Sequence, residues 1–370
     1  SGAMSGSGSL EKAGTGTVEL TYALDYSGST TVNGGTLRMI NSASGDGINP
    51  NANYTVNSGG TLEFNKTGGS NPGTINLSGD GTFKSTGTGE LVQTSVGSTV
   101  ALGSGALFHV ESGIYRFGAN GLGSWSSNLS DLQIDSGATF DGAGTPTVVD
   151  SLNGAGTLKT GGGITFGADN GDGTFSGNIE NSSYGSAKSL TKAGTGTQIL
   201  NGTTTHTGTT TVNGGTLSLG SGYNHNGGGA FVVNAAGTLE GTTDNLQGAT
   251  ITNDGNVRLN QSTDGTYSDA MSGTGSMEKS GTGTVTLSGT NTYSGGTILN
   301  AGALIGTTDS LQGAITNDGT IRFDQSSNGT YSGAMSGSGS LEKSGTGTLT
   351  LSGTTTHTGT TTVNGGTLSL

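Results

Sequence analysis

One passage of about 30 residues is written four times in this 370-residue sequence, and it restricts the fold more than any other feature. The copies lie at about residues 10–40, 190–219, 277–305 and 341–370. Each has a large apolar residue, a lysine two positions later, and then "GTGT". The second and fourth copies share 25 of 30 residues. Literal repetition on this scale is typical of solenoids, in which each unit stacks on the next.

Within a copy, apolar and polar residues alternate. In "TLTL", Leu349 and Leu351 fall on one face, whereas Thr348 and Thr350 fall on the other. That is the period of a half-buried strand. Glycine pairs follow in "VNGGTL" at residues 32–37, and glycine adopts positive φ at low cost. The sequence therefore predicts short strands joined by tight bends.

The spacing of these segments predicts a coil. Val18 and Leu37 lie 19 positions apart, and Leu37 and Leu62 lie 25 apart. Helical periodicity is missing, and a second unit at 241–284 returns at 306–348. We expect one all-β solenoid domain over residues 1–370, with rungs of 19–25 residues.

The opening residues 1–12 match residues 332–343 letter for letter. We therefore expect the sequence to begin and end within a longer array.

Composition excludes several classes of protein. Glycine contributes 76 residues, proline 3, and the formal net charge is −13. With only 12 Lys and Arg residues, the chain lacks the basic surface that nucleic acid requires. Sparse charge and a regular apolar period favour order over disorder. No apolar run is long enough for a membrane span, and no signal peptide is visible.

The passage "LEKSGTGTLTLSGTTTHTGTTTVNGGTLSL" at 341–370 resembles the passenger-associated transport repeat of Gram-negative autotransporters. The resemblance implies a right-handed parallel β-helix, type V secretion, and a place outside the cell, either on the bacterial surface or secreted. It also implies a C-terminal translocator barrel that lies outside residues 1–370.

The resemblance favours an adhesin or self-association factor, a virulence factor that attaches to host cells or aggregates bacteria. Its partners would be a host surface protein or glycan, or further copies of the rod. Two alternatives stay open. One is a secreted effector that binds a host receptor, and the other is a passive stalk that aids outer-membrane translocation.

Candidate chemistry is scarce, so we expect no enzyme, no catalytic residue, no cofactor and no metal. Glu11, Glu278 and Glu342 share one repeat position beside a lysine, which indicates a structural pair. His206 and His357 share another repeat position, which indicates solvated turn residues. The run "DNGDG" at 169–173 lacks calcium-loop spacing and is typical of Asp-Gly turns.

The irregular, aromatic-bearing segment 103–140 departs most from the repeats. It contains the only tryptophan of the sequence. Exposed aromatic and arginine side chains often anchor partners. Five residues of the segment are therefore predicted to bind a partner: Phe108, Tyr115, Arg116, Phe117 and Trp125. The alternative is that the aromatic rings stack inside wider rungs.

Overall fold

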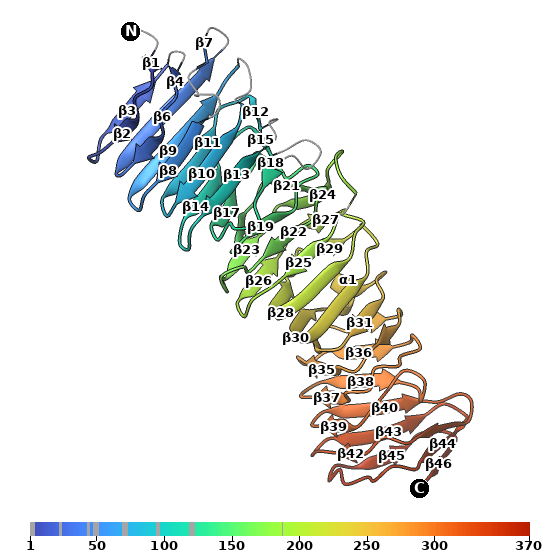
Figure 1. Cartoon of the computed structure of the whole chain (residues 1–370). Helices are drawn as coiled ribbons and strands as arrows, with labels where there is room; N and C mark the ends of the chain where they lie inside the picture. Colours follow the sequence, from blue (N-terminus) through green and yellow to red (C-terminus); the bar gives the residue numbers. More distant parts are fainter. Residues whose placement is uncertain are drawn as a thin grey trace. The chain divides into compact units, whose positions relative to one another are not determined.

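The computed structural model describes residues 4–21, 24–42, 45–46, 52–68, 73–93, 97–117, 123–186 and 188–370. Nearly all regular structure in them consists of short strands that pair in parallel with strands one turn earlier and one turn later (Figure 1). The strands form a β-solenoid of about 17 turns, which confirms the predicted all-β parallel β-helix.

Contacts divide the chain into two units, residues 1–208 and 209–370, which are described one at a time. That residues 1–370 form a single domain stays a prediction.

In residues 1–208 the strands form columns in which each strand pairs in parallel with the next. The first column is β1 (Met4–Gly6) and β4 (Leu24–Tyr26). The second column is β2 (Leu10–Lys12), β5 (Thr30–Val32), β8 (Ala52–Val56), β10 (Ile75–Gly79), β13 (Ser98–Leu102) and β16 (Gly123–Ser124). The longest column is β3 (Thr17–Leu20), β6 (Gly35–Ser42), β9 (Gly60–Lys66), β11 (Thr82–Thr86), β14 (Leu107–Val110), β17 (Asp131–Ile134), β20 (Leu152–Gly154), β23 (Gly173–Phe175) and β26 (Thr197–Leu200). A fourth column is β12 (Glu90–Gln93), β15 (Ile114–Phe117), β18 (Thr139–Asp141), β21 (Thr157–Thr160), β24 (Asn178–Asn181) and β27 (Thr203–Thr204). A fifth is β19 (Thr147–Val149), β22 (Ile164–Phe166) and β25 (Leu190–Lys192). The short β7 (Gly45–Asp46) pairs antiparallel with β6.

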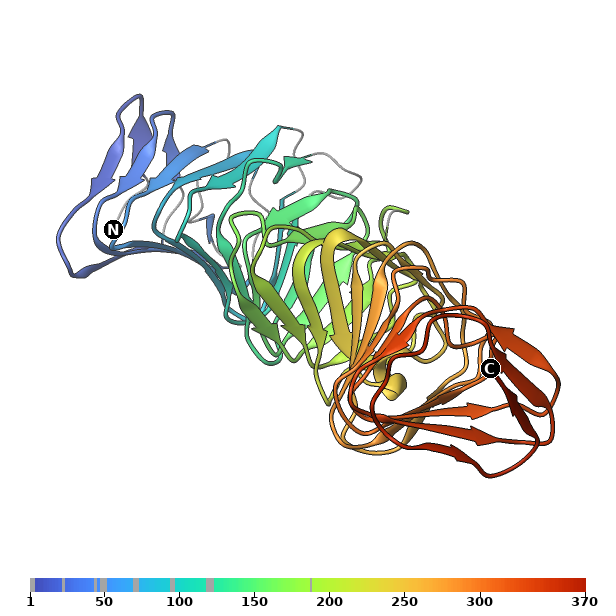
Figure 2. The ribbon, with the colours of Figure 1, turned by 90° about the horizontal axis from the view of Figure 1, so that it is seen from below.

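Residues 209–370 are built in the same way. Strand β28 (Thr210–Leu219) pairs with the long β30 (Phe231–Gly241), which pairs with β31 (Ile251–Asn253) and β32 (Asn256–Asn260). From β31 the column continues to β34 (Met271–Ser272), and from β32 to β35 (Ser276–Ser280), β37 (Thr297–Leu299), β39 (Ile315–Asn317) and β42 (Met335–Ser336). Another column is β33 (Gly265–Tyr267), β36 (Thr284–Leu287), β38 (Ala303–Gly306), β40 (Thr320–Asp324), β43 (Ser340–Ser344) and β45 (Thr361–Val363). The last is β41 (Gly329–Tyr331), β44 (Thr348–Leu351) and β46 (Thr367–Ser369). The unit also holds β29 (Asn224–His225) and the one-turn helix α1 (Thr243–Leu246). In Figure 2 the C-terminal turns are seen nearly end-on, so that the strands of successive turns lie over one another.

The core is a stack of inward side chains, one above another in register. In the first unit Leu37, Leu62, Phe83, Phe108 and Leu132 are successive partners across β6, β9, β11, β14 and β17. Each of the five is 0% exposed. Burying one such side chain contributes about 1.5–3 kcal/mol, so each rung gains stability by covering the previous one.

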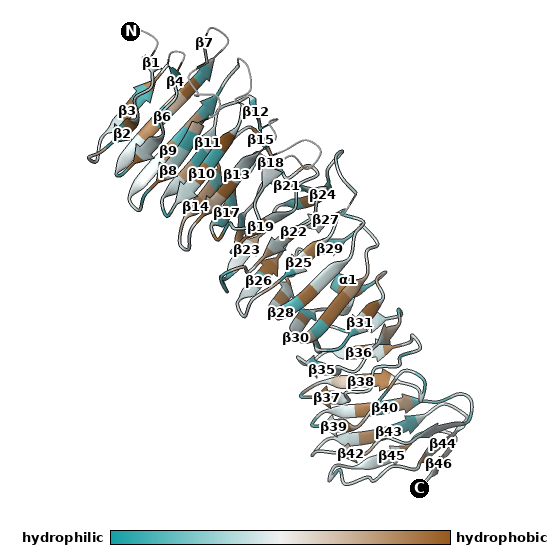
Figure 3. Cartoon of the chain, in the orientation of Figure 1, coloured by the Kyte–Doolittle hydropathy of each residue, from teal (hydrophilic) through white to brown (hydrophobic). Residues whose placement is uncertain are grey.

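The predicted alternation and bends are confirmed. Leu349 and Leu351 of β44 are buried, whereas Thr348 and Thr350 are partly exposed. Figure 3 shows the alternation as hydrophobic and hydrophilic bands along the strands. In the "VNGGTL" bends Gly35, Gly215 and Gly366 have φ of 63°, 60° and 67°. Glycine adopts this conformation without strain.

Candidate functional surface

The lysine of each repeat copy points into the coil. Lys12, Lys192, Lys279 and Lys343 are 5%, 0%, 0% and 0% exposed. In the third copy the Nζ of Lys279 donates hydrogen bonds to the carbonyls of Ser280 (2.8 Å), Gly281 (2.7 Å) and Ala301 (3.2 Å). Ala301 belongs to the next turn of the coil, so one ammonium group fastens two successive bends together.

Two of the other copies repeat this arrangement. Lys12 donates to Ala13, Gly14 and Gly34 at 2.9, 2.8 and 2.8 Å. Lys343 reaches Gly365 of the following turn at 3.2 Å. Carbonyl oxygens are the right partners for a cation that is shielded from water.

Burial lowers the pKa of both Lys192 and Lys279 below the ordinary value of 10.5, because the charged form loses solvation.

The expected pairing of this lysine with the neighbouring glutamate is wrong. Adjacent residues of a strand point to opposite faces, so Glu278 faces out while Lys279 faces in. The Oε2 of Glu278 accepts a hydrogen bond from Arg258 Nε at 2.9 Å, and its Oε1 accepts one from Asn300 at 2.7 Å. Burial acts to raise the pKa of this carboxyl group, but the hydrogen bond and charge of Arg258, with the amide hydrogen bonds, leave it below its ordinary value.

At the second bend of the repeat, a tyrosine or histidine side chain forms a hydrogen bond with the threonine four residues later. The hydroxyls of Tyr293 and Thr297 lie 2.7 Å apart, and Nε2 of His357 lies 2.9 Å from Oγ1 of Thr361. His206 occupies the same repeat position and is 0% exposed. The expectation of a solvated turn residue is therefore wrong for His206, because the next rung covers the bend.

The four aromatic residues predicted to bind a partner lie in the core. Phe108, Tyr115, Phe117 and Trp125 are each 0% exposed. The ring centroids of Phe108 and Trp125 are 4.8 Å apart, and the Tyr115 hydroxyl donates to Gln93 at 2.7 Å. Burial raises the pKa of the Tyr115 hydroxyl well above its ordinary value. The geometry matches the alternative, aromatic stacking inside wide rungs, so these four rings are not available as anchors.

Arg116 is the one residue of the five with an exposed surface, and its guanidinium is already engaged. Its Nε lies 2.9 Å from a carboxylate oxygen of the buried Asp141, and its Nη1 contacts Glu90. The ring of Tyr184 lies 5.2 Å from the guanidinium carbon. A partner-binding role for Arg116 and segment 103–140, of which residues 118–122 lie outside the described residues, stays a prediction.

Outward side chains form rows that cross-link successive rungs. Arg38 lies between Glu19 (3.4 Å) and Glu63 (3.0 Å) of the neighbouring strands. In the second unit Arg258 lies between Glu240 (3.1 Å) and Glu278 (2.9 Å). Glu63 is only 5% exposed, but the other side chains of these pairs are partly exposed, and ion pairs in contact with water add little stability. They do give the outer face an ordered polar surface.

Uncharged amides form further rows. Asn57 Nδ2 donates to Asn33 Oδ1 at 2.6 Å, and Asn33 Nδ2 donates to Glu11 at 2.7 Å. In the second unit Asn234 donates to Asn213 at 2.6 Å.

One outward row of the second unit carries an exposed apolar side chain. Ile298 is 40% exposed and lies between Glu278 and Thr316 of the neighbouring strands. None of the strongly exposed large hydrophobic side chains of the described residues is aromatic.

Aspartate side chains in the turns accept hydrogen bonds from backbone N–H groups. Asp150 Oδ1 accepts from the N–H groups of Asp169 (2.6 Å) and Gly171 (2.8 Å), and Asp172 Oδ1 accepts from that of Thr197 (2.5 Å). The "DNGDG" run thus holds bends of successive rungs together. Over the ranges that the structure describes, no three His, Cys, Asp or Glu side chains are grouped so as to hold a metal ion.

Comparison with known proteins identifies the repeat. Residues 10–39, 190–219, 277–305 and 341–370 match the passenger-associated-transport-repeat family. No curated protein and no solved structure showed a significant match to the chain. No helix of the described residues has the length and apolar character needed to cross a membrane.

Proposed function

From the premise that four passenger-associated transport repeats on a parallel β-solenoid indicate an autotransporter passenger, we propose that this chain is a non-enzymatic adhesin or self-association factor. It acts outside the cell, on the bacterial surface or after release. It attaches to host cells or to other copies through the outward rows of its strands. The proposed role needs no catalytic group and no cofactor.

The observation that carries the proposal is the ordered polar outer face. Rows of Glu, Arg, Asn and Thr repeat from rung to rung and are held in place by hydrogen bonds between rungs. Each contact with a partner would be weak, but a series of such contacts adds up through multivalency. The aromatic residues, which usually dominate compact binding sites, are used for the core instead.

Within this face, the row Glu278–Ile298–Thr316 is the part we assign to contact. Ile298 supplies apolar area that is lost from water on binding, and its polar neighbours fix the orientation of the partner. The net charge of −13 opposes self-association at low salt. Added salt screens that repulsion, so association of copies is expected to strengthen as ionic strength rises.

The test compares two variants of the purified chain that carry the same added charge. Ile298→Glu/Thr316→Glu alters the proposed row, whereas Thr330→Glu/Ser332→Glu places two carboxylates at exposed positions on and just after β41. Sedimentation velocity over a concentration series measures self-association, and binding of labelled protein to cultured host cells measures attachment. The first variant is expected to lose association or attachment, and the second is expected to keep it.

Other outcomes point to the alternatives. Saturable host-cell binding by a monomer that both variants retain would favour an effector with a local patch elsewhere. Absence of both activities in the unaltered chain would contradict the adhesin and leave the passive stalk.

A further inference from the structure

The outward row of the longest strand column changes in character along its length. From β3 to β17 the register partners are the long side chains of Glu19, Arg38, Glu63, Lys84, His109 and Gln133. The next three positions hold Asn153, Thr174 and Ile199, which are shorter and uncharged. Where the long side chains end, on β20, β23 and β26, the outer face has a hollow of about 340 Å³.

This hollow, the Asp172 hollow, is open to solvent and large enough for one small ligand. Its volume lies at the lower end of the range of about 300–1,000 Å³ that is usual for small-molecule sites. The residues that line it are Asn153, Asp172, Gly173, Thr174, Thr197 and Ile199.

Hydrogen bonds between rungs hold the lining in place. Asn153 Nδ2 donates to the hydroxyl of Ser151 at 2.6 Å, and Asn153 Oδ1 accepts from the N–H of Thr174 at 3.0 Å. One oxygen of Asp172, Oδ1, accepts from the N–H of Thr197 at 2.5 Å. A ligand therefore meets side chains that are already ordered, which lowers the entropic cost of binding.

Several polar groups of the lining are left for a ligand. In the described part of the chain, Oδ2 of Asp172 and the hydroxyls of Thr174 and Thr197 take part in no hydrogen bond. A carboxylate oxygen accepts hydrogen bonds, and a hydroxyl both donates and accepts them. Ile199 adds an apolar surface beside these groups. The set suits a ligand that has several hydroxyl groups and one apolar face.

The charge around the hollow disfavours an anionic ligand. Asp150, Asp169 and Asp172 belong to the same pair of successive turns, since Asp150 Oδ1 accepts from the N–H of Asp169. The nearby cation is Lys192, which is buried and donates to the carbonyl of Ala193. An added carboxylate would meet repulsion here, so a neutral ligand fits better.

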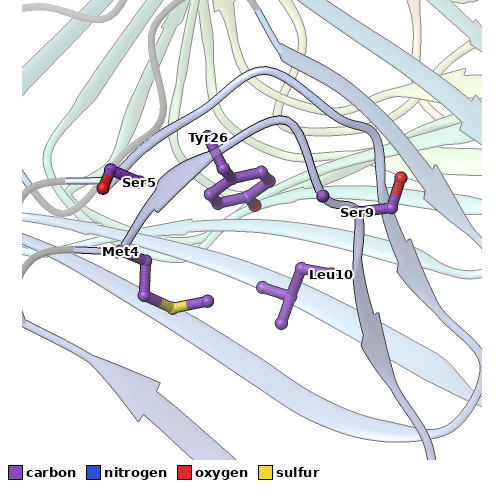
Figure 4. A pocket seen from close by; sticks show the side chains of 6 residues that line it. Met4, Ser5, Ser9, Leu10 and Tyr26 are labelled. Atoms are coloured by element: carbon purple, nitrogen blue, oxygen red, sulfur yellow. The ribbon is translucent and has the colours of Figure 1, made fainter.

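Two other hollows of the described chain lack this character. One lies at the first described rung, where the side chains of Met4, Leu10 and Tyr26 gather around it (Figure 4). The other, of about 160 Å³, lies beside Tyr331. Neither is lined by a charged side chain, so neither offers the charged acceptor that Asp172 supplies.

We propose that the Asp172 hollow binds a neutral saccharide, as one hexose unit of a glycan. Asp172 Oδ2 and the hydroxyls of Thr174 and Thr197 bond the hydroxyl groups of the sugar, and Ile199 packs against its C–H face. A single sugar binds weakly, with a Kd of about 1–10 mM, because no aromatic ring lines the hollow. This row is not the row Glu278–Ile298–Thr316, so the assignment does not rest on the proposed adhesive role.

The test titrates the full chain, with methyl-labelled isoleucine, with the methyl glycosides of galactose, glucose and mannose up to about 100 mM. The methyl signal of Ile199 is expected to shift saturably with at least one of them. Ile298, which is 40% exposed, reports non-specific contact and is expected to stay in place. Galacturonic and glucuronic acid carry a carboxylate on the same rings and are expected to bind at least about tenfold more weakly than the matching neutral sugar.

Variants of the chain separate binding from folding. Asp172→Asn keeps an oxygen for the N–H of Thr197 but removes the charged acceptor, so affinity is expected to fall at least about tenfold. Thr174→Gln places a long side chain in the hollow and is expected to abolish binding. The matched control is Thr266→Gln, because Thr266 is also exposed and also lies between a glycine and an aromatic residue on its strand. The control is expected to bind as the unaltered chain does.

Four results would overturn the proposal. The first is the absence of a saturable Ile199 shift with all three glycosides, and the second is a parallel shift of Ile298. The third is equal affinity in Thr174→Gln and Thr266→Gln, since the sugar would then bind elsewhere. The fourth is equal affinity for a neutral sugar and its acid, which would contradict the role of Asp172.

Discussion

Replacing Lys279 by methionine tests whether the inward lysine fastens successive turns. Lys279→Met keeps the length of the side chain but removes three hydrogen bonds, to Ser280, Gly281 and Ala301. Bonds to a charged donor contribute about 1.5–3 kcal/mol each. Methionine no longer buries an ammonium group, which offsets several kcal/mol of that loss. The net expectation is a loss of about 3 kcal/mol in local stability, because carbonyls are left without a donor.

Hydrogen exchange measured over residues 276–305 is the suitable assay, because solenoid rungs open locally and a global unfolding curve can miss the change. The matched control is Glu278→Met, on the outer face of the same strand. It removes a partly exposed ion pair to Arg258, which is worth about 0–1 kcal/mol. A loss in Lys279→Met no larger than that in the control would refute the fastening role.

Four further outcomes are expected. As pH rises toward 10.5, the ordinary pKa of lysine, stability should rise, because the lowered pKa values of Lys192 and Lys279 mean that the unfolded chain binds more protons there; urea midpoints measured on the approach to that pH check it, and a flat or falling profile would contradict it. Burial raises the pKa of four tyrosines in the folded chain, namely Tyr115, Tyr267, Tyr293 and Tyr331. Above pH 10.0 stability should therefore fall, because these tyrosines ionise first in the unfolded chain. Tyrosinate absorbance should appear together with the loss of β-structure. Gly337→Ala should destabilise more than Gly6→Ala in thermal unfolding, because φ is positive at both positions but only at Gly337 would a Cβ lie 2.1 Å from a backbone oxygen, that of Asn317; equal losses would show that backbone strain alone matters. Phe108→Ala should cost about 3–5 kcal/mol in urea unfolding, as expected for a large cavity in a packed core, and a loss below about 1 kcal/mol would mean that the ring does not support its neighbours.

Much of the fold could be predicted because a parallel coil depends on local rules that repeat. Alternation placed Leu349 and Leu351 inside, and the glycine pairs marked the bends. The segment "TQIL" at 197–200 breaks this alternation, so the sequence alone specifies the register of its strand less well. Gln198 points inward there, and its side chain bonds the N–H and carbonyl of Leu152 at 3.0 and 2.8 Å. That partner lies 46 residues away, and no local pattern identifies it.

The candidate site was harder to predict, because the rarity of aromatic residues in the sequence was interpreted as the sign of a binding surface. Phe108 and Val110, and likewise Tyr115 and Phe117, stand two positions apart with a polar residue between them. This alternation indicated a buried face, although the scarcity of aromatic residues elsewhere favoured a partner surface. The sequence also indicated that the lysine points inward, because Lys12 lies two positions after the inward Leu10 and therefore on the same face of the strand. The adjacent glutamate suggested a pair instead.

The repeat specifies how one rung stacks on another and leaves the outer face free to vary. Its lysine, its bend glycines and its Tyr or His closing on threonine all act inside the coil or at its bends. In the first strand after "GTGT", the inward positions of the last three copies hold Gln198, Val285 and Leu349, and the outward positions hold Ile199, Thr286 and Thr350. Inward residues are constrained by the rungs above and below, whereas outward residues meet only their row neighbours and a partner. A match to the repeat therefore fixes the coil and says little about the ligand. Exchanging an outward row should change binding without changing the unfolding free energy, whereas exchanging the lysines should do the reverse.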